Sequence, residues 1–334
     1  MATLNVAVLG GGSWGTTVAS LVTRNAPVTL WARDAATVEE INSQHTNRTY
    51  LPGATLPDKL TATTDLAAAV TDADIVVMAV PSQYFRSVLS AAREHIRASI
   101  PVVSLTKGLE LDSHLRMTQI IGELLPGHPV AVLTGPNLAR EIMDGKAAAS
   151  VIAMEDEVIV RELQAIFGSG LFRVYTNTDV IGCELGGVLK NIIAIAVGMG
   201  DGQGAGDNTR AALITRGLAE ITRLGVAMGG RAETFAGLAG MGDLIATSTS
   251  PQSRNHHVGV ELARGRNPQQ ITADMVMVAE GVKSAPAVMA LADEHGVEMP
   301  IAGEVCRVLS GESSASRGFR GLLRVGTGAE WEPG

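Results

Sequence analysis

A lysine inside a long apolar helix is the first candidate for chemistry in this sequence. Residues 180–202 have the pattern of a helix that is apolar on nearly every side, and Lys190 and Asn191 lie in its middle. Burial of an unpaired lysine is expensive and lowers its pKa toward the range in which the amine exchanges a proton near neutral pH. Such a lysine suits general acid–base catalysis. The alternative is a structural lysine whose stem follows the helix while its amine reaches water, and this segment alone does not separate the two.

A glycine-rich turn near the N-terminus predicts a second kind of chemistry, the binding of a dinucleotide. Gly10, Gly12 and Gly15 have the spacing G-x-G-x-x-G, directly after the apolar run 5–9 and before a helical stretch. In this context the first glycine permits a tight turn, the second lets a pyrophosphate approach the backbone, and the third lets the helix pack close to the strand. The unpaired N–H groups of the helix N-terminus attract the phosphates. A glycine turn without a ligand is the less favoured interpretation.

The end of the next apolar run, 28–32, bears on the choice of cofactor. An NAD site usually has an acidic residue here that binds the ribose 2′-hydroxyl, whereas this chain has Arg33 followed by Asp34. Arg33 suits a 2′-phosphate, and Asp34 is better placed to cap the helix that follows. The pattern therefore favours NADP. Because an arginine also stacks on adenine without reading the phosphate, NAD stays open.

Alternating apolar runs and helices indicate the element that positions these residues. Further short buried runs occur at 74–80, 101–105, 130–133, 150–153 and 172–175. This order is typical of an α/β fold with a Rossmann-type, doubly wound, mostly parallel sheet. Ligands of such sheets lie beyond the carboxyl ends of the strands, where Lys107, Gly135 and Asn137 are expected. For Lys107 a solvated loop lysine is the competing interpretation.

The strand pattern stops after about residue 178, and helices take over. We therefore expect a dinucleotide-binding Rossmann domain at 1–178 and an all-α substrate domain at 179–334. Asp243 lies at the expected start of one helix in the second domain. A plain N-cap is the alternative to a functional role for this carboxylate.

A polar turn in the second half is a candidate phosphate pocket. Ser253, Arg254 and Asn255 open a helix, and their donors together with the helix N-terminus suit an anion. A simple capping turn has the same sequence pattern. His256 and His257 follow directly, and because neighbouring positions share neither one helix face nor a metal-binding spacing, we expect both to face solvent.

The composition excludes several functional classes. The 334 residues carry a net charge of −8 without a basic run, which argues against a nucleic-acid surface. Cys183 and Cys306 are far apart in apolar contexts, which indicates reduced thiols and no metal site. The N-terminus lacks a signal peptide, and no uninterrupted apolar run reaches the ~20 residues that span a bilayer. We expect a soluble cytoplasmic protein without membrane insertion, and the apolar helical half leaves room for a homodimer face.

Eight segments, in this order and spacing, resemble one family, the bacterial NAD(P)-dependent glycerol-3-phosphate dehydrogenases. They are G-G-G-S-W-G-T at 10–16, L-T-K-G-L-E at 105–110, G-P-N-L-A-R-E at 135–141, E-L-G-G-V-L-K-N-I-I-A-I-A at 184–196, D-N-T-R-A-A-L-I-T-R-G at 207–217, T-F-A-G-L-A-G-M-G-D-L at 234–244, S-R-N at 253–255 and A-E-G at 279–281. The resemblance covers nearly the whole chain. The chain departs from the family at Asn137, where a small hydroxyl residue is usual, and at Leu138, where an aromatic residue is usual.

The resemblance implies an active site between a Rossmann domain and a helical substrate domain, and it implies roles for individual residues. Lys190 is the implied proton donor and acceptor, with Asn191 and Thr247 as supporting polar groups. The residues implied to bind substrate are Lys107, Gly135, Asn137, Lys190, Asp243, Ser253, Arg254 and Asn255. Those implied to contact the cofactor are Gly10, Gly12, Ser13, Trp14, Gly15, Arg33, Lys107, Ala139, Arg254, Val278 and Glu280.

The expected reaction is the reversible reduction of dihydroxyacetone phosphate by NADPH or NADH to sn-glycerol 3-phosphate for phospholipid synthesis. Lys190 would exchange the proton at the C2 oxygen, with Lys107 and Asp243 orienting it. Contacts of Arg254 and Asn255 with the substrate phosphate would supply the binding energy that positions C2. One alternative is a related two-domain dehydrogenase of a 2-hydroxy acid or sugar acid. Another is a non-catalytic NADP-binding sensor, which has no need of Lys190 in an apolar helix.

Overall fold

A computed structural model describes residues 4–322 and divides the chain into two compact units. The first unit contains Met1–Lys107 and Leu115–Val180, and the second contains Gly108–His114 and Ile181–Gly334. The short segment Gly108–His114 thus groups with the helical half, although it lies within the sequence of the first. Its Leu109 is fully buried in the apolar core of the second unit.

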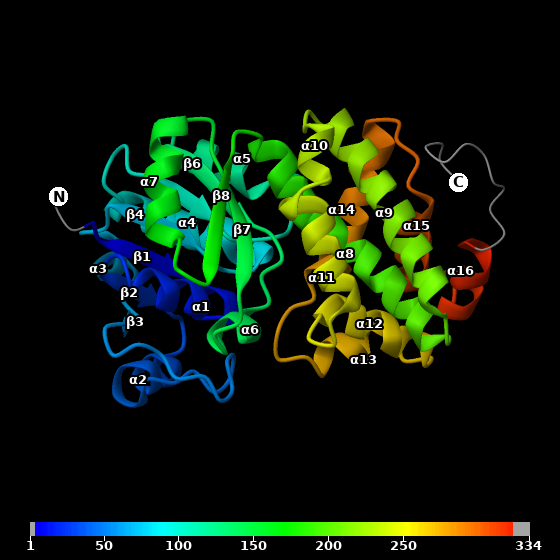
Figure 1. Ribbon diagram of the computed structural model, residues 1–334, viewed down its shortest axis with the longest axis horizontal. Coiled ribbons are helices and arrows are strands. Elements are labelled where there is room, and N and C mark those ends of the chain that lie inside the picture. The colour runs from blue at the N-terminus through cyan, green and yellow to red at the C-terminus, as the bar shows by residue number, and fades with distance from the viewer. Residues whose placement is uncertain (1–3, 323–334) are drawn as a thin grey trace. The chain divides into compact units, whose positions relative to one another are not determined.

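The first unit is built on an eight-stranded sheet (Figure 1). The strand order is β3-β2-β1-β4-β5-β6-β7-β8, and every neighbouring pair is parallel except β6 with β7. The strands are β1 Val6–Leu9, β2 Val28–Trp31, β3 Thr61–Thr63, β4 Ile75–Met78, β5 Val102–Ser104, β6 Val130–Thr134, β7 Ala148–Ala153 and β8 Phe172–Asn177. The order reverses at β1 and β4, and this is the switch point at which doubly wound sheets bind ligands.

Both faces of this sheet are covered by helices. The helices are α1 Ser13–Val22, α2 Ala35–Gln44, α3 Leu66–Val70, α4 Ser82–Ala92, η1 Arg93–His95, α5 Met117–Leu124, α6 Ala139–Met143 and α7 Glu157–Phe167. Alternate residues of β1 enter separate cores: Val6 and Val8 pack in the core that includes α1 and α7, and Ala7 and Leu9 pack in the core that includes α4 and α5. Burial on both faces explains why the strands are continuous apolar runs in the sequence.

The second unit is helical. Its helices are α8 Val180–Gly202, α9 Asp207–Ala227, α10 Ala232–Phe235, η2 Leu238–Gly242, α11 Asp243–Thr249, α12 Arg254–Ala263, α13 Pro268–Ala273, α14 Glu280–Glu294, α15 Pro300–Ser310 and α16 Ala315–Leu322. The Rossmann-type sheet followed by a helical half confirms the predicted fold class. The small, polar sequence from Ser313 onward predicts a loosely held tail, whereas the structure forms helix α16 over Ala315–Leu322; residues 323–334 lie outside the described part.

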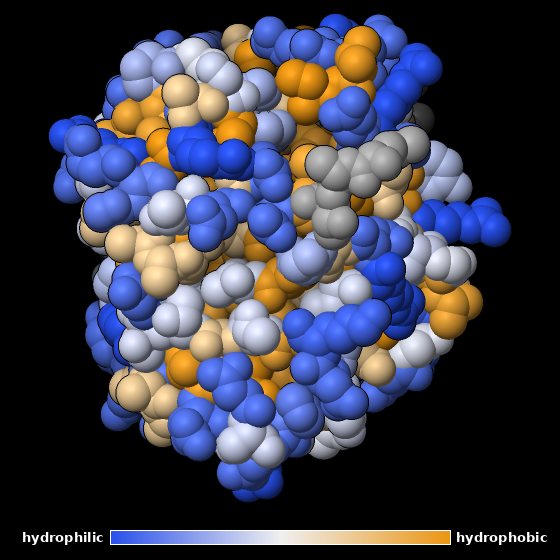
Figure 2. Space-filling view, turned by 90° about the vertical axis from the view of Figure 1, so that its left-hand side faces the viewer, coloured by the Kyte–Doolittle hydropathy of each residue, from blue (hydrophilic) through white to orange (hydrophobic). Residues whose placement is uncertain are grey.

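Helix α8 is the central element of the second unit (Figure 1). All its residues from Gly182 to Gly200 are buried, including Glu184, Lys190 and Asn191. By length and composition it is the one helix among residues 4–322 that could cross a membrane, but 89% of its most apolar 18-residue window is buried in the protein. Its apolar surface therefore forms the core of the unit. On the face of the molecule in Figure 2, hydrophilic residues predominate and hydrophobic residues form small separate groups.

Candidate active site

The glycine turn after β1 has the geometry that a dinucleotide requires. Gly10 has φ +131°, and a Cβ there would lie 2.7 Å from the carbonyl group of Ala79, so only glycine fits. A Cβ at Gly15 would lie 2.0 Å from the Gly10 oxygen, which explains why helix α1 approaches the strand so closely. A Cβ at Gly12 would meet nothing within 4 Å. The open side of the turn is thus at Gly12, the N-cap of α1, where unpaired N–H groups suit a pyrophosphate.

Two residues at the start of α1 complete this turn. Ser13 is the first residue of the helix, and Thr17 Oγ1 donates to its carbonyl oxygen at 2.8 Å. The ring of Trp14 packs edge-on against Phe172, with centroids 6.2 Å apart. The Trp14 indole N–H is buried and has no hydrogen-bond partner, so it can donate to a bound group.

Arg33 and Asp34 have separate tasks at the end of β2. Asp34 is the N-cap of α2, and its Oδ2 accepts from Thr37 N at 2.8 Å and from Thr37 Oγ1 at 2.7 Å. These hydrogen bonds lower the pKa of Asp34. The Arg33 guanidinium lies over the Tyr84 ring, 5.8 Å from its centroid. The acid is therefore engaged by its own helix, and the arginine lies on an aromatic ring.

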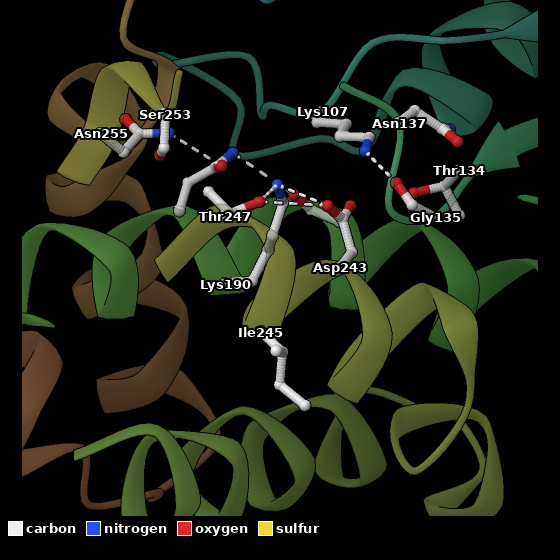
Figure 3. Close-up of polar contacts among 12 residues, drawn as sticks. Lys107, Thr134, Gly135, Asn137, Lys190, Asp243, Ile245, Thr247, Ser253 and Asn255 are labelled. Atoms are coloured by element: carbon white, nitrogen blue, oxygen red, sulfur yellow. Dashed lines mark hydrogen bonds and ion pairs between the residues drawn. The ribbon is translucent and has the colours of Figure 1, made fainter. Parts of the chain in front are cut away.

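The carboxyl ends of β5 and β6 bring together the three predicted substrate residues of the first unit (Figure 3). Lys107 Nζ donates to Gly135 O at 2.8 Å. Asn137 Nδ2 donates to Ser150 Oγ at 3.1 Å, and Ser150 Oγ donates to Thr134 O at 2.7 Å. Asn137 Oδ1 is buried without a partner, as is Thr134 Oγ1. Ser150 comes from strand β7, which pairs antiparallel with β6, and no sequence pattern indicates its contact with Asn137.

In the second unit, Lys190, Asp243 and Thr247 form one buried polar cluster (Figure 3). Lys190 Nζ lies 2.8 Å from Asp243 Oδ1, and these side chains are 6% and 3% exposed. Lys190 Nζ also donates to Thr247 Oγ1, and Thr247 Oγ1 donates to Asp243 Oδ1 at 3.1 Å. Each of the three groups thus contacts the other two. Loss of one partner of such a buried ion pair typically destabilises a protein by about 3–5 kcal/mol.

The local structure of α11 explains how Asp243 and Thr247 reach the lysine. They are four residues apart and share the buried face of α11, whereas Ile245 and Thr249 are exposed. The π-helical segment η2 directly precedes this helix, and such segments are frequent at functional sites. Asp243, the first residue of α11, follows Gly242, whose backbone is already helical, so η2 continues into α11 without a break.

The asparagines of α8 and α12 form a second polar contact beside this cluster. Asn255 Nδ2 donates to Asn191 Oδ1 at 2.9 Å, and Asn191 Nδ2 donates to Gly187 O at 3.3 Å. Asn255 Oδ1 accepts from Gly281 N at 3.1 Å in the first turn of α14. Ser253 is the N-cap of α12, as expected from the sequence, and its Oγ accepts from the backbone N of residue 256 at 3.2 Å.

The remaining predicted cofactor residues occupy helix starts and one loop. Arg254, the first residue of α12, is exposed, and its Nη1 donates to Val278 O at 2.7 Å. Glu280 is the first residue of α14. Ala139 is the first residue of α6 in the first unit. Arg254 and Val278 are therefore in direct contact, although they are 24 residues apart.

The expectation that His256 faces solvent is wrong. Its side chain is 16% exposed, and its Nε2 lies 2.8 Å from Asp201 Oδ2 near the end of α8. His257 is exposed, as expected. The sequence pattern missed Asp201 because its partners lie on other helices. Among residues 4–322, no three His, Cys, Asp or Glu side chains are grouped so as to hold a metal ion.

Comparisons with known proteins indicate the same family for both halves of the chain. Residues 5–160 match the family described as the NAD-dependent glycerol-3-phosphate dehydrogenase N-terminus, and residues 179–320 match the corresponding C-terminus. The chain is 71% identical over 331 residues, 99% of each protein, to glycerol-3-phosphate dehydrogenase [NAD(P)+] 2 of Sphingopyxis alaskensis. It is 53% identical to glycerol-3-phosphate dehydrogenase [NAD(P)+] 1 of Mycobacterium tuberculosis, over 97% of this chain and 96% of the relative. It is also similar to the crystal structure of glycerol-3-phosphate dehydrogenase from Coxiella burnetii, with a TM-score of 0.92, 37% identity and coverage of 96% of this chain and 99% of that chain.

Proposed function

The chain belongs to the NAD-dependent glycerol-3-phosphate dehydrogenase family, and on this premise we propose that it reduces dihydroxyacetone phosphate to sn-glycerol 3-phosphate with NAD(P)H. The reaction is reversible, and the reductive direction supplies the glycerol phosphate backbone of phospholipids. The observation that carries the proposal is the buried cluster of Lys190, Asp243 and Thr247. A non-catalytic NADP-binding sensor has no need of such a cluster, and the relatives do not favour a 2-hydroxy acid or a sugar acid as the substrate.

Lys190 is the general acid of the reduction and the general base of the oxidation. Bound NAD(P)H supplies the hydride to the C2 carbon of the substrate. The C2 oxygen then gains negative charge, and Lys190 Nζ donates a proton to it. Desolvation favours the neutral form of a lysine, and an adjacent carboxylate favours the charged form. Asp243 and Thr247 bind Nζ on two sides, so they hold the ammonium group in one orientation for this transfer.

The phosphate of the substrate is the anion that we assign to the first turn of α12. Ser253, Arg254 and Asn255 supply a hydroxyl, a guanidinium and an amide at the N-terminus of a ten-residue helix. Binding energy from this remote group raises the rate at C2 by positioning the carbonyl. In the first unit we assign Lys107, Gly135 and Asn137 to the substrate as well. Asn137 Oδ1 has no partner in the protein and is therefore an acceptor for the substrate. A small hydroxyl residue, which is usual at this position in the family, would place its acceptor differently.

The glycine turn of the first unit binds the pyrophosphate of the cofactor, and Arg33 selects among cofactors. The ribose 2′-hydroxyl of NAD is usually bound by a carboxylate, but that of Asp34 is already engaged by Thr37. Arg33 extends over Tyr84 and presents a guanidinium to a 2′-phosphate. We therefore propose that the enzyme uses both cofactors and prefers NADPH.

A substrate panel tests the proposed function. The purified protein is incubated with NADPH and dihydroxyacetone phosphate, dihydroxyacetone or several 2-keto acids, and the oxidation of NADPH is followed optically. We expect turnover of dihydroxyacetone phosphate, and a drop in kcat/KM of at least about 100-fold when the phosphate is removed, because a charge-assisted phosphate contact contributes several kcal/mol. Faster turnover of a 2-keto acid would refute the assignment.

We also propose that the enzyme acts in the cytoplasm, where its NAD(P)H pool lies, and that it pairs as a homodimer through its helical half. The burial of α8 argues against membrane insertion, and the first point is proposed on that ground. Size-exclusion chromatography with light scattering tests the second point, and a monomer mass at micromolar concentration would refute it.

A further inference from the structure

Helices α8 and α12 lie against each other with backbone in contact with backbone. A Cβ at Gly198 would lie 2.1 Å from the carbonyl oxygen of His256, and a Cβ at Gly259 would lie 2.1 Å from that of Ile195. A Cβ at Gly202 would lie 2.5 Å from Ala263 Cβ. The two helices therefore meet along a row of glycines that permits very close approach.

Such a contact allows little interlocking of side chains. Ridges of side chains that fit into grooves normally set the register of two packed helices, and glycine supplies no ridge. The register of α12 on α8 must therefore depend on polar contacts at the flanks of the glycine row. The described structure has three of these: Asn255 Nδ2 with Asn191 Oδ1 at 2.9 Å, His256 Nε2 with Asp201 Oδ2 at 2.8 Å and, just beyond the end of α8, Gln203 Nε2 with the carbonyl oxygen of Ala263 at 3.0 Å.

The contact of His256 with Asp201 is fixed from a third helix. Arg210, in the first turn of α9, donates Nε to Asp201 Oδ1 at 3.0 Å and Nη1 to Asp207 Oδ1 at 2.6 Å. These hydrogen bonds with carboxylates raise the pKa of Arg210. An ionised carboxylate only accepts hydrogen bonds, so the His256 ring must carry its proton on Nε2. Asp201 thus holds His256 while Arg210 holds Asp201.

We propose that His256 is a positioning residue that fixes the phosphate-binding turn of α12, residues 253–255, against α8. Its backbone N donates to the Ser253 cap and its ring is held by Asp201, so both ends of the residue are anchored. Residues 254 and 255 lie between the Ser253 cap and His256. The orientation of their side chains therefore depends on how the turn is held. The inference rests on the assignment of the substrate phosphate to this turn.

Three variants test this role. In His256→Ala the anchor is lost, and we expect the KM for dihydroxyacetone phosphate to rise about tenfold, which corresponds to about 1.4 kcal/mol, while kcat changes less than threefold. In His256→Gln the amide nitrogen reaches the position of Nε2, and we expect the KM to return toward that of the wild type. His257→Ala, at the exposed neighbouring position, is the matched control and should change neither constant.

The pattern of constants separates positioning from a general effect on folding. A merely structural role would lower the Tm and the active fraction, and hence kcat, while the KM stayed constant. That outcome, or a KM for His256→Gln as high as that for His256→Ala, would overturn the proposal. An unchanged KM in His256→Ala would overturn it as well.

A binding experiment distinguishes failure of this inference from failure of the proposed function. Titration calorimetry with inorganic phosphate measures the anion site directly, without turnover. If the wild type fails to reduce dihydroxyacetone phosphate but binds phosphate more tightly than His256→Ala, the proposed substrate is wrong and the positioning role stands. If both proteins bind phosphate equally, the positioning role is wrong whatever the substrate.

Discussion

Glu220 provides a quantitative test of how burial controls the stability of the second unit. It lies on α9, is 2% exposed, and its carboxylate accepts from Ile301 N at 2.7 Å and from Ala302 N at 3.2 Å. These are N–H groups of the first turn of α15. Burial raises the pKa of Glu220 from 4.5 to about 7, although the two backbone hydrogen bonds and then Arg223 and Arg216 act in the opposite direction.

The raised pKa predicts the direction in which stability changes with pH. Between about pH 4.5 and pH 7 the folded protein keeps the proton on Glu220 and the unfolded chain loses it. The contribution of the Glu220 side chain to the free energy of unfolding is therefore fully present below pH 4.5, and it is lost as the pH rises through about 7. The rise of the pKa from 4.5 to about 7 corresponds to a loss of about 3 kcal/mol in the free energy of unfolding across this pH range.

Glu220→Gln removes the titration and keeps an acceptor for α15. As the pH rises from 4.5 to 8, the wild type should lose about 3 kcal/mol of unfolding free energy that the variant keeps. The difference between the two Tm values should therefore grow by about 5–10 °C. Calorimetric Tm values at half-unit pH steps measure this, and Glu294→Gln, at an exposed position of α14, is the control. Parallel pH profiles of wild type and Glu220→Gln would refute the reasoning.

Three further predictions concern the binding sites. Gly12→Ala should leave the Tm unchanged and raise the KM for NADPH at least about tenfold. Gly15→Ala should lower the Tm strongly, because its Cβ would lie 2.0 Å from a carbonyl oxygen. Thermal melting and cofactor titration of both variants check these two results. Arg33→Ala should lower kcat/KM for NADPH at least about tenfold and that for NADH much less, which steady-state kinetics with both cofactors measures; equal losses would exclude the 2′-phosphate contact. Asn255→Ala leaves the Asn191 oxygen and a buried backbone N–H without this partner and should lower stability by about 2–3 kcal/mol, and urea denaturation measures the loss.

The sequence predicted the sheet and the glycine turn because both depend on local signals. Buried parallel strands are short apolar runs, and Gly10 and Gly15 occupy positions at which a Cβ would clash with the backbone. The Asp34 cap was also predictable, because its partner Thr37 is only three residues away. The grouping of Gly108–His114 with the helical unit was not predictable, since it depends on where Leu109 is buried.

The sequence indicates candidate residues for the site, and their roles stay predictions, but it does not indicate the contacts between them. Lys190 is conspicuous in the sequence because it interrupts an apolar helix, yet its partner Asp243 lies 53 positions away on another helix. Ser150 and Asp201 have no local signal, because their roles arise from the pairing of β6 with β7 and from the packing of α8 with α12. Tertiary contacts of this kind become visible only when the chain is folded.

The central claim is that Lys190 exchanges the proton at the C2 oxygen, and Lys190→Arg tests it most directly. Arginine keeps a positive charge beside Asp243, so the fold should persist, but it does not release its proton near neutral pH. The measurement is the single-turnover rate of NADPH oxidation with saturating dihydroxyacetone phosphate, with Lys283→Ala, an exposed lysine of α14, as the control. We predict a rate at least about 100-fold below the wild type, with normal NADPH binding and a normal rate in the control. A rate within threefold of the wild type would contradict the account.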